Sequence, residues 1–259
     1  MGNSQSHPII PVIPISGIIS PTTGCCFKKV NAILEKTFRT HKIHTLALLI
    51  NSPGGSPVQC EYMVTRIRAL AKKHNVKVLA FIQDVAASGG YYIACAADEI
   101  YASSSSIVGS VGVISSGFGL DKFIENHGIE RRIYAQGDNK ALLDPFLPQK
   151  PSDVEILNSI GKDIHSSFID IVKRSRGSKL DLEYSGLFTG EVWSGSRAKE
   201  LGLIDDTGDM YSILQSKFGP NVQISYMEEK KSFLSKLTGS IGILTNLCSS
   251  LYSSIFYPM

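Results

Sequence analysis

Two short apolar runs joined by an amphipathic stretch constrain the fold of this chain more than any other feature. Thr45–Ile50 and Val76–Ile82 are predominantly apolar and short, which predicts two buried strands. Between them, Pro57–His74 carries apolar side chains at helical spacing, with Val58 and Tyr62 on or near the apolar face. A strand–helix–strand order implies a crossover connection and therefore parallel strands. The sequence predicts an α/β fold with a mainly parallel sheet.

Further elements are predicted on both sides of this unit. Ile9–Ile19 is apolar with regular prolines, which predicts an edge strand, where a missing N–H group is tolerated. Ser152 is predicted to cap a long helix, with Glu155 completing a capping box. The remaining strands are predicted at Asp98–Ala102, Gly109–Ile114 and Glu130–Tyr134, and the helices at Gly24–Thr40, Tyr91–Ala97, Leu120–His127, Ser152–Arg176 and Gly195–Leu203.

The composition is that of an ordinary globular protein. The 259 residues are 43% hydrophobic and 19% charged, and we expect one α/β domain over residues 1–236. A net charge of +3 is too small to predict nucleic-acid binding. The five cysteines are odd in number and lack Cys-x-x-Cys spacing, which predicts free buried thiols in a reducing compartment. No metal site or other cofactor is expected, because no His-x-x-x-His pattern or carboxylate cluster is present.

The two ends of the chain carry weaker signals. No signal peptide or clear transmembrane helix is visible, so a cytoplasmic or membrane-associated protein is expected. Met1–Ser6 fits the pattern for myristoylation of Gly2. Residues 237–259 form an uncharged tail, which we expect to pack on a neighbouring subunit, with peripheral membrane contact as the alternative.

Ser88 occupies the turn between the predicted strand Val76–Ile82 and the helix that follows. Its hydroxyl would project toward a helix N-terminus, whose free N–H groups favour developing negative charge. Gly54 and Gly55 follow the preceding strand, and ligands of open α/β sheets bind at such strand ends. Each loop alone is typical of a plain turn. Adjacent strand ends would bring them together, and a nucleophile facing an oxyanion hole is the minimum for acyl transfer.

A serine nucleophile also needs a base, and the residues alone leave two candidates. Among the six histidines, only His127 lies near the end of a predicted strand. The alternative is a lysine that burial keeps neutral. Lys140 suits this role because the apolar Ala141–Leu143 follows it.

Several motifs, in order along the chain, resemble the signal peptide peptidase A family of serine–lysine peptidases (peptidase family S49). The resemblance runs from about Ile9 to Tyr211. The motifs that carry it are Asn51–Ser56, Ala86–Tyr92, Ala96–Tyr101, Gly109–Ile114, Gly137–Lys140 with Pro145-Phe146, and Phe188–Asp205.

The resemblance implies a ClpP/crotonase-type fold of stacked ββα units and hydrolysis of peptide bonds in hydrophobic segments, such as signal-peptide remnants. It implies Ser88 as nucleophile and Lys140 as base. It also implies oxyanion-hole N–H groups from Gly54, Gly55 and Gly89, and a Ser110 hydroxyl that holds the lysine amine.

The resemblance also bears on assembly. Family members of this length tend to form homo-oligomeric rings, so Lys140 could face Ser88 of its own chain or of the next. Typical bacterial members carry an N-terminal membrane anchor, which this sequence does not show.

Three alternatives remain beside the serine–lysine peptidase. A crotonase-like acyl-CoA enzyme would use the same fold and oxyanion hole without a nucleophile. A ClpP-like Ser–His–Asp triad would use His127 in place of Lys140. A membrane-associated scaffold would bind apolar segments without cutting them.

Overall fold

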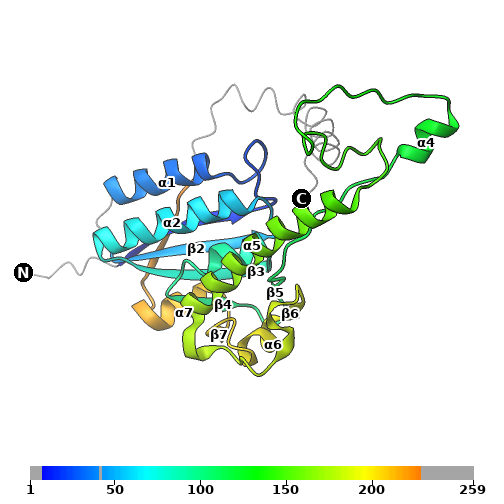
Figure 1. Cartoon of the computed structure of the whole chain (residues 1–259). Helices are drawn as coiled ribbons and strands as arrows, with labels where there is room; N and C mark the ends of the chain where they lie inside the picture. The colour runs from blue at the N-terminus through cyan, green and yellow to red at the C-terminus, as the bar shows by residue number, and fades with distance from the viewer. Residues whose placement is uncertain (1–7, 41–42, 229–259) are drawn as a thin grey trace, which may run out of the picture. The chain divides into compact units, whose positions relative to one another are not determined.

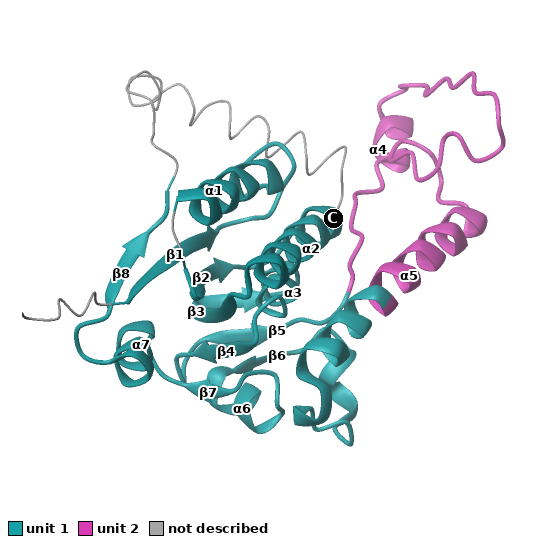
Figure 2. Ribbon diagram, turned by 90° about the vertical axis from the view of Figure 1, so that its left-hand side faces the viewer, with its two compact units in different colours: residues 1–112, 167–231 teal, residues 113–166, 232–259 magenta. Residues whose placement is uncertain are grey.

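The computed structural model describes residues 8–40 and 43–228, which form two compact units (Figure 2). Of the described residues, unit 1 holds 8–40, 43–112 and 167–228, and unit 2 holds 113–166. One domain over residues 1–236 stays a prediction, and the predicted tail lies outside the described residues. The elements are β1 (Ile9–Ser16), α1 (Phe27–Thr40), β2 (Thr45–Ser52), α2 (Pro57–His74), β3 (Lys77–Ala87), α3 (Gly89–Ala94), β4 (Glu99–Ala102), β5 (Ile107–Gly109), α4 (Asp121–Asn126), α5 (Pro151–Arg176), β6 (Val192–Ser194), α6 (Gly195–Glu200), β7 (Asp206–Thr207), α7 (Met210–Phe218) and β8 (Gln223–Tyr226), with 3-10 turns at Gly177–Lys179 and Ser185–Phe188.

An eight-stranded sheet organises unit 1 (Figure 1). Its main strand order is β6-β5-β3-β2-β1-β8, and β4 lies between β3 and β7. The pairs are parallel except for β5–β6, which is antiparallel. The predicted α/β fold with a mainly parallel sheet is confirmed.

Side chains that alternate along the central strands build a core on each face of the sheet. Leu46, Leu48 and Ile50 of β2 pack on the face covered by α1 and α2. Ala47 of the same strand belongs to a smaller cluster, which Met210 and Leu214 of α7 complete on the other face. Because strand side chains alternate between faces, a strand buried on both sides reads as a continuous apolar run.

The predicted edge position of β1 is wrong, because β1 lies between β2 and β8. An interior strand can hold Pro11 and Pro14 because each lies outside the paired residues on one side of β1. Pro11 precedes the first β1–β2 pair, Val12↔Ala47, and Pro14 follows the last β1–β8 pair, Val12↔Tyr226. Neither missing N–H group therefore interrupts pairing on both sides.

Three other expectations need correction. The strand predicted at Gly109–Ile114 is Ile107–Gly109 instead, because Gly109 (φ +116°) and Ser110 (φ +55°) leave the extended conformation. Residues 130–134 form no strand in the described structure, and most of their side chains are exposed. The long helix begins at Pro151, a favoured first residue, so Ser152 lies inside it and is not its cap.

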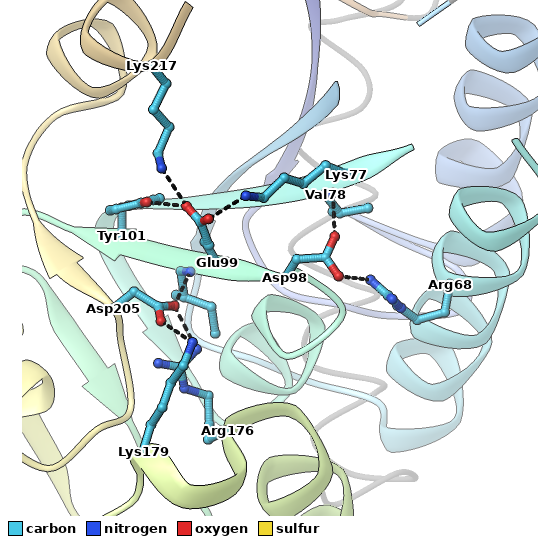
Figure 3. Close-up of polar contacts among 11 residues, drawn as sticks. Arg68, Lys77, Val78, Asp98, Glu99, Tyr101, Arg176, Lys179, Asp205 and Lys217 are labelled. Atoms are coloured by element: carbon cyan, nitrogen blue, oxygen red, sulfur yellow. Dashed lines mark hydrogen bonds and ion pairs between the residues drawn. The ribbon is translucent and has the colours of Figure 1, made fainter. Parts of the chain in front are cut away.

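A buried ion pair joins the end of α5 to the loop before β7 (Figure 3). Arg176 is only 2% exposed and donates to Asp205 at 2.8 Å and to the Gly202 carbonyl at 2.9 Å. Asp205 also pairs with Lys179 and accepts the N–H of Ile100 at 2.7 Å. Burial alone would raise the pKa of the Asp205 carboxyl, but the bonds from Arg176, Lys179 and Ile100 outweigh it and lower that pKa. The carboxylate therefore fastens α5 to the sheet in its charged form.

Asp205→Asn should destabilise the protein by about 3–5 kcal/mol, because it leaves the buried Arg176 guanidinium without a counter-charge. Urea unfolding at neutral pH measures the change. The pKa of Asp205 is lower in the folded than in the unfolded protein. Its contribution to the free energy of unfolding is therefore complete above the unfolded-state pKa of about 4, and it is lost as the pH falls through the folded-state pKa.

The matched control is Glu130→Gln, which breaks the pair with Arg132, where both side chains are exposed. The free energy of unfolding of that variant should fall by less than about 1 kcal/mol. Equal losses in the two variants would contradict a structural role for Asp205.

Candidate active site

Ser88 lies at the turn between β3 and α3, as predicted, and its backbone is strained. Its dihedral angles are φ +50° and ψ −123°, which residues with a side chain rarely adopt. Its N–H donates to the Gly109 carbonyl at 2.8 Å, and its carbonyl accepts the N–H of Tyr92 at 2.9 Å. Strain of this kind persists only where the surroundings over-determine it, and it is common at functional sites. The Ser88 side chain is partly exposed at this turn.

The Gly54–Gly55 loop lies directly against Ser88, so the structure brings the two predicted loops together. A Cβ atom on Gly54 would lie 2.8 Å from Ser88 Cβ and 2.8 Å from Gly89 N. Gly54 also has φ +111°, which favours glycine. Close backbone approach and backbone conformation therefore both require glycine at residue 54.

The three predicted oxyanion-hole residues differ in their N–H groups. The Gly54 N–H donates to Ser52 Oγ at 3.1 Å and is already used. Within residues 8–40 and 43–228, the N–H groups of Gly55 and Gly89 have no hydrogen-bond acceptor. A Cβ atom on Gly89 would lie 3.2 Å from Gly55 N, so the two free donors are close neighbours beside Ser88. Two donors in this arrangement can bind a developing oxyanion.

Cys60 packs against Gly89, one of these two donors. A Cβ atom on Gly89 would lie 2.6 Å from Cys60 Sγ, so the thiol fills the space under α3. Burial raises the pKa of the Cys60 thiol to about 12, so it is a neutral packing group. The prediction of free buried thiols is confirmed for the cysteines in the described ranges, Cys25, Cys26, Cys60 and Cys95, while Cys248 lies outside them.

Ser110 lies in the same neighbourhood. It follows Gly109, whose carbonyl accepts the Ser88 N–H, and its own N–H donates to the Glu191 carbonyl at 2.6 Å. Ser110 has φ +55°, a second left-handed serine beside the site. Strand pairing between β5 and β6 therefore sets the backbone at Ser110.

The two candidate bases belong to unit 2, whereas Ser88 belongs to unit 1. Lys140 lies in an exposed turn, where its N–H donates to the Gly137 carbonyl at 3.1 Å. His127 follows α4, is exposed, and has Nδ1 2.8 Å from the Phe123 carbonyl. Neither base is therefore held in the same compact unit as the nucleophile.

The described residues carry neither a metal-binding cluster nor a membrane-spanning helix. Across residues 8–40 and 43–228, no group of three or more His, Cys, Asp or Glu side chains could hold a metal ion. No helix in those same ranges combines the length and apolar character needed to cross a membrane.

Sequence reasoning missed Ser52, Ile19 and Asp84. Ser52 Oγ donates to the Gly17 carbonyl at 2.7 Å, and the Ile19 N–H donates to the Gly54 carbonyl at 2.8 Å. Asp84 accepts from the Asn51 side-chain amide at 2.6 Å. Each contact joins residues more than thirty positions apart, and local patterns carry no signal for it.

The chain matches the family model described as "Peptidase family S49" over residues 70–218. It is 44% identical over 240 residues to a Brucella melitensis protein named Na(+)/H(+) antiporter NhaA, covering 90% of this chain and 32% of that protein. It is 30% identical over 265 residues to the chloroplastic serine protease SPPA of Arabidopsis thaliana, covering 98% of this chain and 38% of that one. The chain thus spans about a third of the length of both relatives.

The fold is similar to a solved structure of the 1510-N membrane-bound stomatin-specific protease, a lysine-to-alanine mutant in complex with a substrate peptide. The TM-score is 0.56 at 18% identity, over 91% of this chain and 98% of the other. This likeness confirms the predicted ClpP-type fold.

Gly54→Ala should destabilise the protein by at least about 2 kcal/mol. The new methyl group would overlap Ser88, and the alanine would have to keep a positive φ that residues with a side chain rarely adopt. Urea unfolding measures the loss. Gly117→Ala is the control, since a Cβ atom there meets no atom of the described structure within 4 Å. Equal stability of the two variants would show that the Gly54 loop does not press on Ser88.

Proposed function

Because the chain belongs to peptidase family S49, a family of serine peptidases, we propose that it hydrolyses peptide bonds with a Ser88–Lys140 dyad. One observation carries the proposal. The strained turn places Ser88 beside the free N–H groups of Gly55 and Gly89. A nucleophile next to two preorganised donors matches the requirement of acyl transfer.

The proposed reaction begins when Ser88 Oγ attacks the carbonyl carbon of the scissile bond. The neutral Lys140 amine takes the hydroxyl proton, and the N–H groups of Gly55 and Gly89 bind the oxyanion of the tetrahedral intermediate. When the C–N bond breaks, Lys140 returns the proton to the leaving amine. Water then attacks the acyl carbon while Lys140 takes a proton from it. The bond between the acyl carbon and Ser88 Oγ breaks, Lys140 passes the proton to Ser88 Oγ, and the carboxylic acid product leaves. In this proposal Gly54 does not bind the oxyanion, because its own N–H donates to Ser52 Oγ. Its role is to let the loop approach Ser88 without a side chain.

Lys140 needs surroundings that keep its amine neutral, and it is exposed in the single chain. We therefore propose that a homo-oligomeric ring completes the site and that Lys140 acts on Ser88 of a neighbouring copy. The hydroxyl of Ser110, two residues before the boundary of unit 1, is proposed to orient the amine.

Substrates are proposed to be peptides with hydrophobic segments, such as signal-peptide remnants. Ile18, Val58 and Tyr62 are 54%, 50% and 51% exposed, although the helical spacing puts Val58 and Tyr62 on or near the apolar face of α2. Ile18 directly precedes Ile19, which bonds to the Gly54 loop, and α2 begins directly after that loop. Exposed apolar side chains beside the proposed oxyanion hole suit an apolar substrate residue.

Ser88→Ala should abolish cleavage of an apolar peptide, and Lys140→Ala should lower kcat by about 10²–10⁴-fold, the usual contribution of a general base. Initial rates with the purified full chain measure both. Ser105→Ala and Lys122→Ala, both at exposed positions, are the matched controls and should keep wild-type rates.

Mixing the two inactive variants tests the ring. If sites form between copies, a Ser88→Ala chain supplies Lys140 to a Lys140→Ala chain, and activity returns in part. No recovery would place both residues in one chain. Loss of activity in His127→Ala with full activity in Lys140→Ala would replace the dyad by a histidine-based triad.

Tyr62→Ser should raise KM for a peptide with apolar residues by about tenfold with kcat unchanged, because it removes apolar area that the substrate covers. Steady-state kinetics measure the split. Leu182→Ser is the control, since Leu182 is 59% exposed in unit 1 and has no place in the proposed site. An unchanged KM in Tyr62→Ser would refute this substrate contact.

A further inference from the structure

Ser52 is a buried hydroxyl residue whose bonds hold the loop that carries Gly55. It is the last residue of β2 and is 0% exposed. Its Oγ donates to the Gly17 carbonyl at 2.7 Å and accepts the Gly54 N–H at 3.1 Å. One hydroxyl thus ties the end of β1 to the first glycine of the pair.

The segment after β1 restrains the same loop through its backbone. The Ile19 N–H donates to the Gly54 carbonyl at 2.8 Å, and the Ser56 N–H donates to the Ile19 carbonyl at 2.8 Å. The fit leaves no space, since a Cβ atom on Gly55 would lie 2.0 Å from the Ile19 carbonyl oxygen.

These bonds fix the direction of the Gly55 N–H group. The Gly54 carbonyl and the Gly55 N–H belong to one planar trans peptide, so they point in opposite directions. Because Ile19 holds the carbonyl, the N–H must point away from Ile19. Ser52 holds the preceding Gly54 N–H, which opposes rotation of the loop about its glycine dihedral angles.

We propose that Ser52 is a positioning residue for the oxyanion hole, which it serves by fixing the peptide that carries the Gly55 donor. This inference rests on the proposed peptidase function. Without the Ser52 hydroxyl, the buried Gly54 N–H and the Gly17 carbonyl both lose a partner, and the glycine pair can turn to satisfy them. The Gly55 N–H then leaves the direction that a tetrahedral intermediate requires, whereas the ground-state substrate loses little.

The test is Ser52→Ala in the full chain, with kcat and KM measured on one apolar peptide. We expect kcat to fall by about 10–100-fold with KM nearly unchanged, a smaller loss than the roughly 10²–10³-fold of removing an oxyanion donor outright. Affinity for a peptide boronate, which forms a tetrahedral adduct, should fall with kcat. Affinity of the uncleaved peptide for Ser88→Ala should not change when Ser52→Ala is added.

Thr37→Val is the matched control for loss of a buried hydroxyl. Thr37 is 0% exposed in α1, and its Oγ1 donates to the Ile33 carbonyl at 2.8 Å. This variant should lower the thermal midpoint as Ser52→Ala does but keep kcat. An unchanged kcat in Ser52→Ala, or an equal loss in Thr37→Val, would overturn the positioning role.

A second substitution at Ser52 and the activity of the wild type separate this proposal from misfolding and from failure of the proposed peptidase function. If Ser52→Ala does not fold, Ser52→Cys fills the site with a slightly larger atom that forms weaker hydrogen bonds, and its kcat should be reduced in the same way. A wild-type kcat in Ser52→Cys would overturn the proposal. Failure of the proposed function looks different, because the wild type would then be inactive or Ser88→Ala would remain active.

Discussion

The strained turn at Ser88 depends on the way β3 changes its neighbour. Its first half, Leu79–Ile82, pairs with β4, and its last residues, Val85–Ala87, pair with β5. At the changeover β3 bulges, with residues 83–85 lying between the β2 pairs Ile50↔Ile82 and Ser52↔Ala86. The buried Ser106 hydroxyl donates to the Gln83 carbonyl and secures this bulge. The strand pairing to β5 then continues to the Ser88 N–H, so sheet hydrogen bonds hold the strained residue.

The same sheet gathers the other parts of the site. Gly17 follows β1, Gly54 and Gly55 follow β2, Ser88 follows β3, and Ser110 follows β5. Since these strands are parallel, their carboxyl ends meet at one edge. Each loop is then short enough to be placed by the strand before it. The β1–β2 ladder ends at Ser16↔Asn51, and the Gly17 N–H extends it by donating to the Asn51 carbonyl at 2.9 Å.

The sequence predicts correctly those features that depend on neighbouring residues in the chain. The bounds of α2, the turn at Ser88 and the glycine pair after β2 follow from composition and periodicity within a few residues. The interior position of β1 was missed because it depends on β8, a four-residue strand more than two hundred positions away. The exposure of Val58 and Tyr62 was missed because periodicity shows which side chains share one face of α2. It does not show whether another element covers that face near the start of the helix. The division of Ser88 and Lys140 between two units is also invisible to local patterns.

Gly54 and Gly55 look alike in the sequence but have different surroundings in the structure. In the sequence Gly54 and Gly55 are equivalent, and both were assigned to the oxyanion hole. In the structure they are glycine for different reasons, since a side chain at Gly54 would strike Ser88 and one at Gly55 would strike Ile19. Their N–H groups also differ, because Ser52 binds one and leaves the other free. The residue with the free donor is thus held by the segment after β1. Both that segment and the glycine pair precede residue 70, where the match to the family model begins. The proposed nucleophile and its proposed oxyanion hole therefore depend on contacts between β1 and β2 as much as on the turn at Ser88.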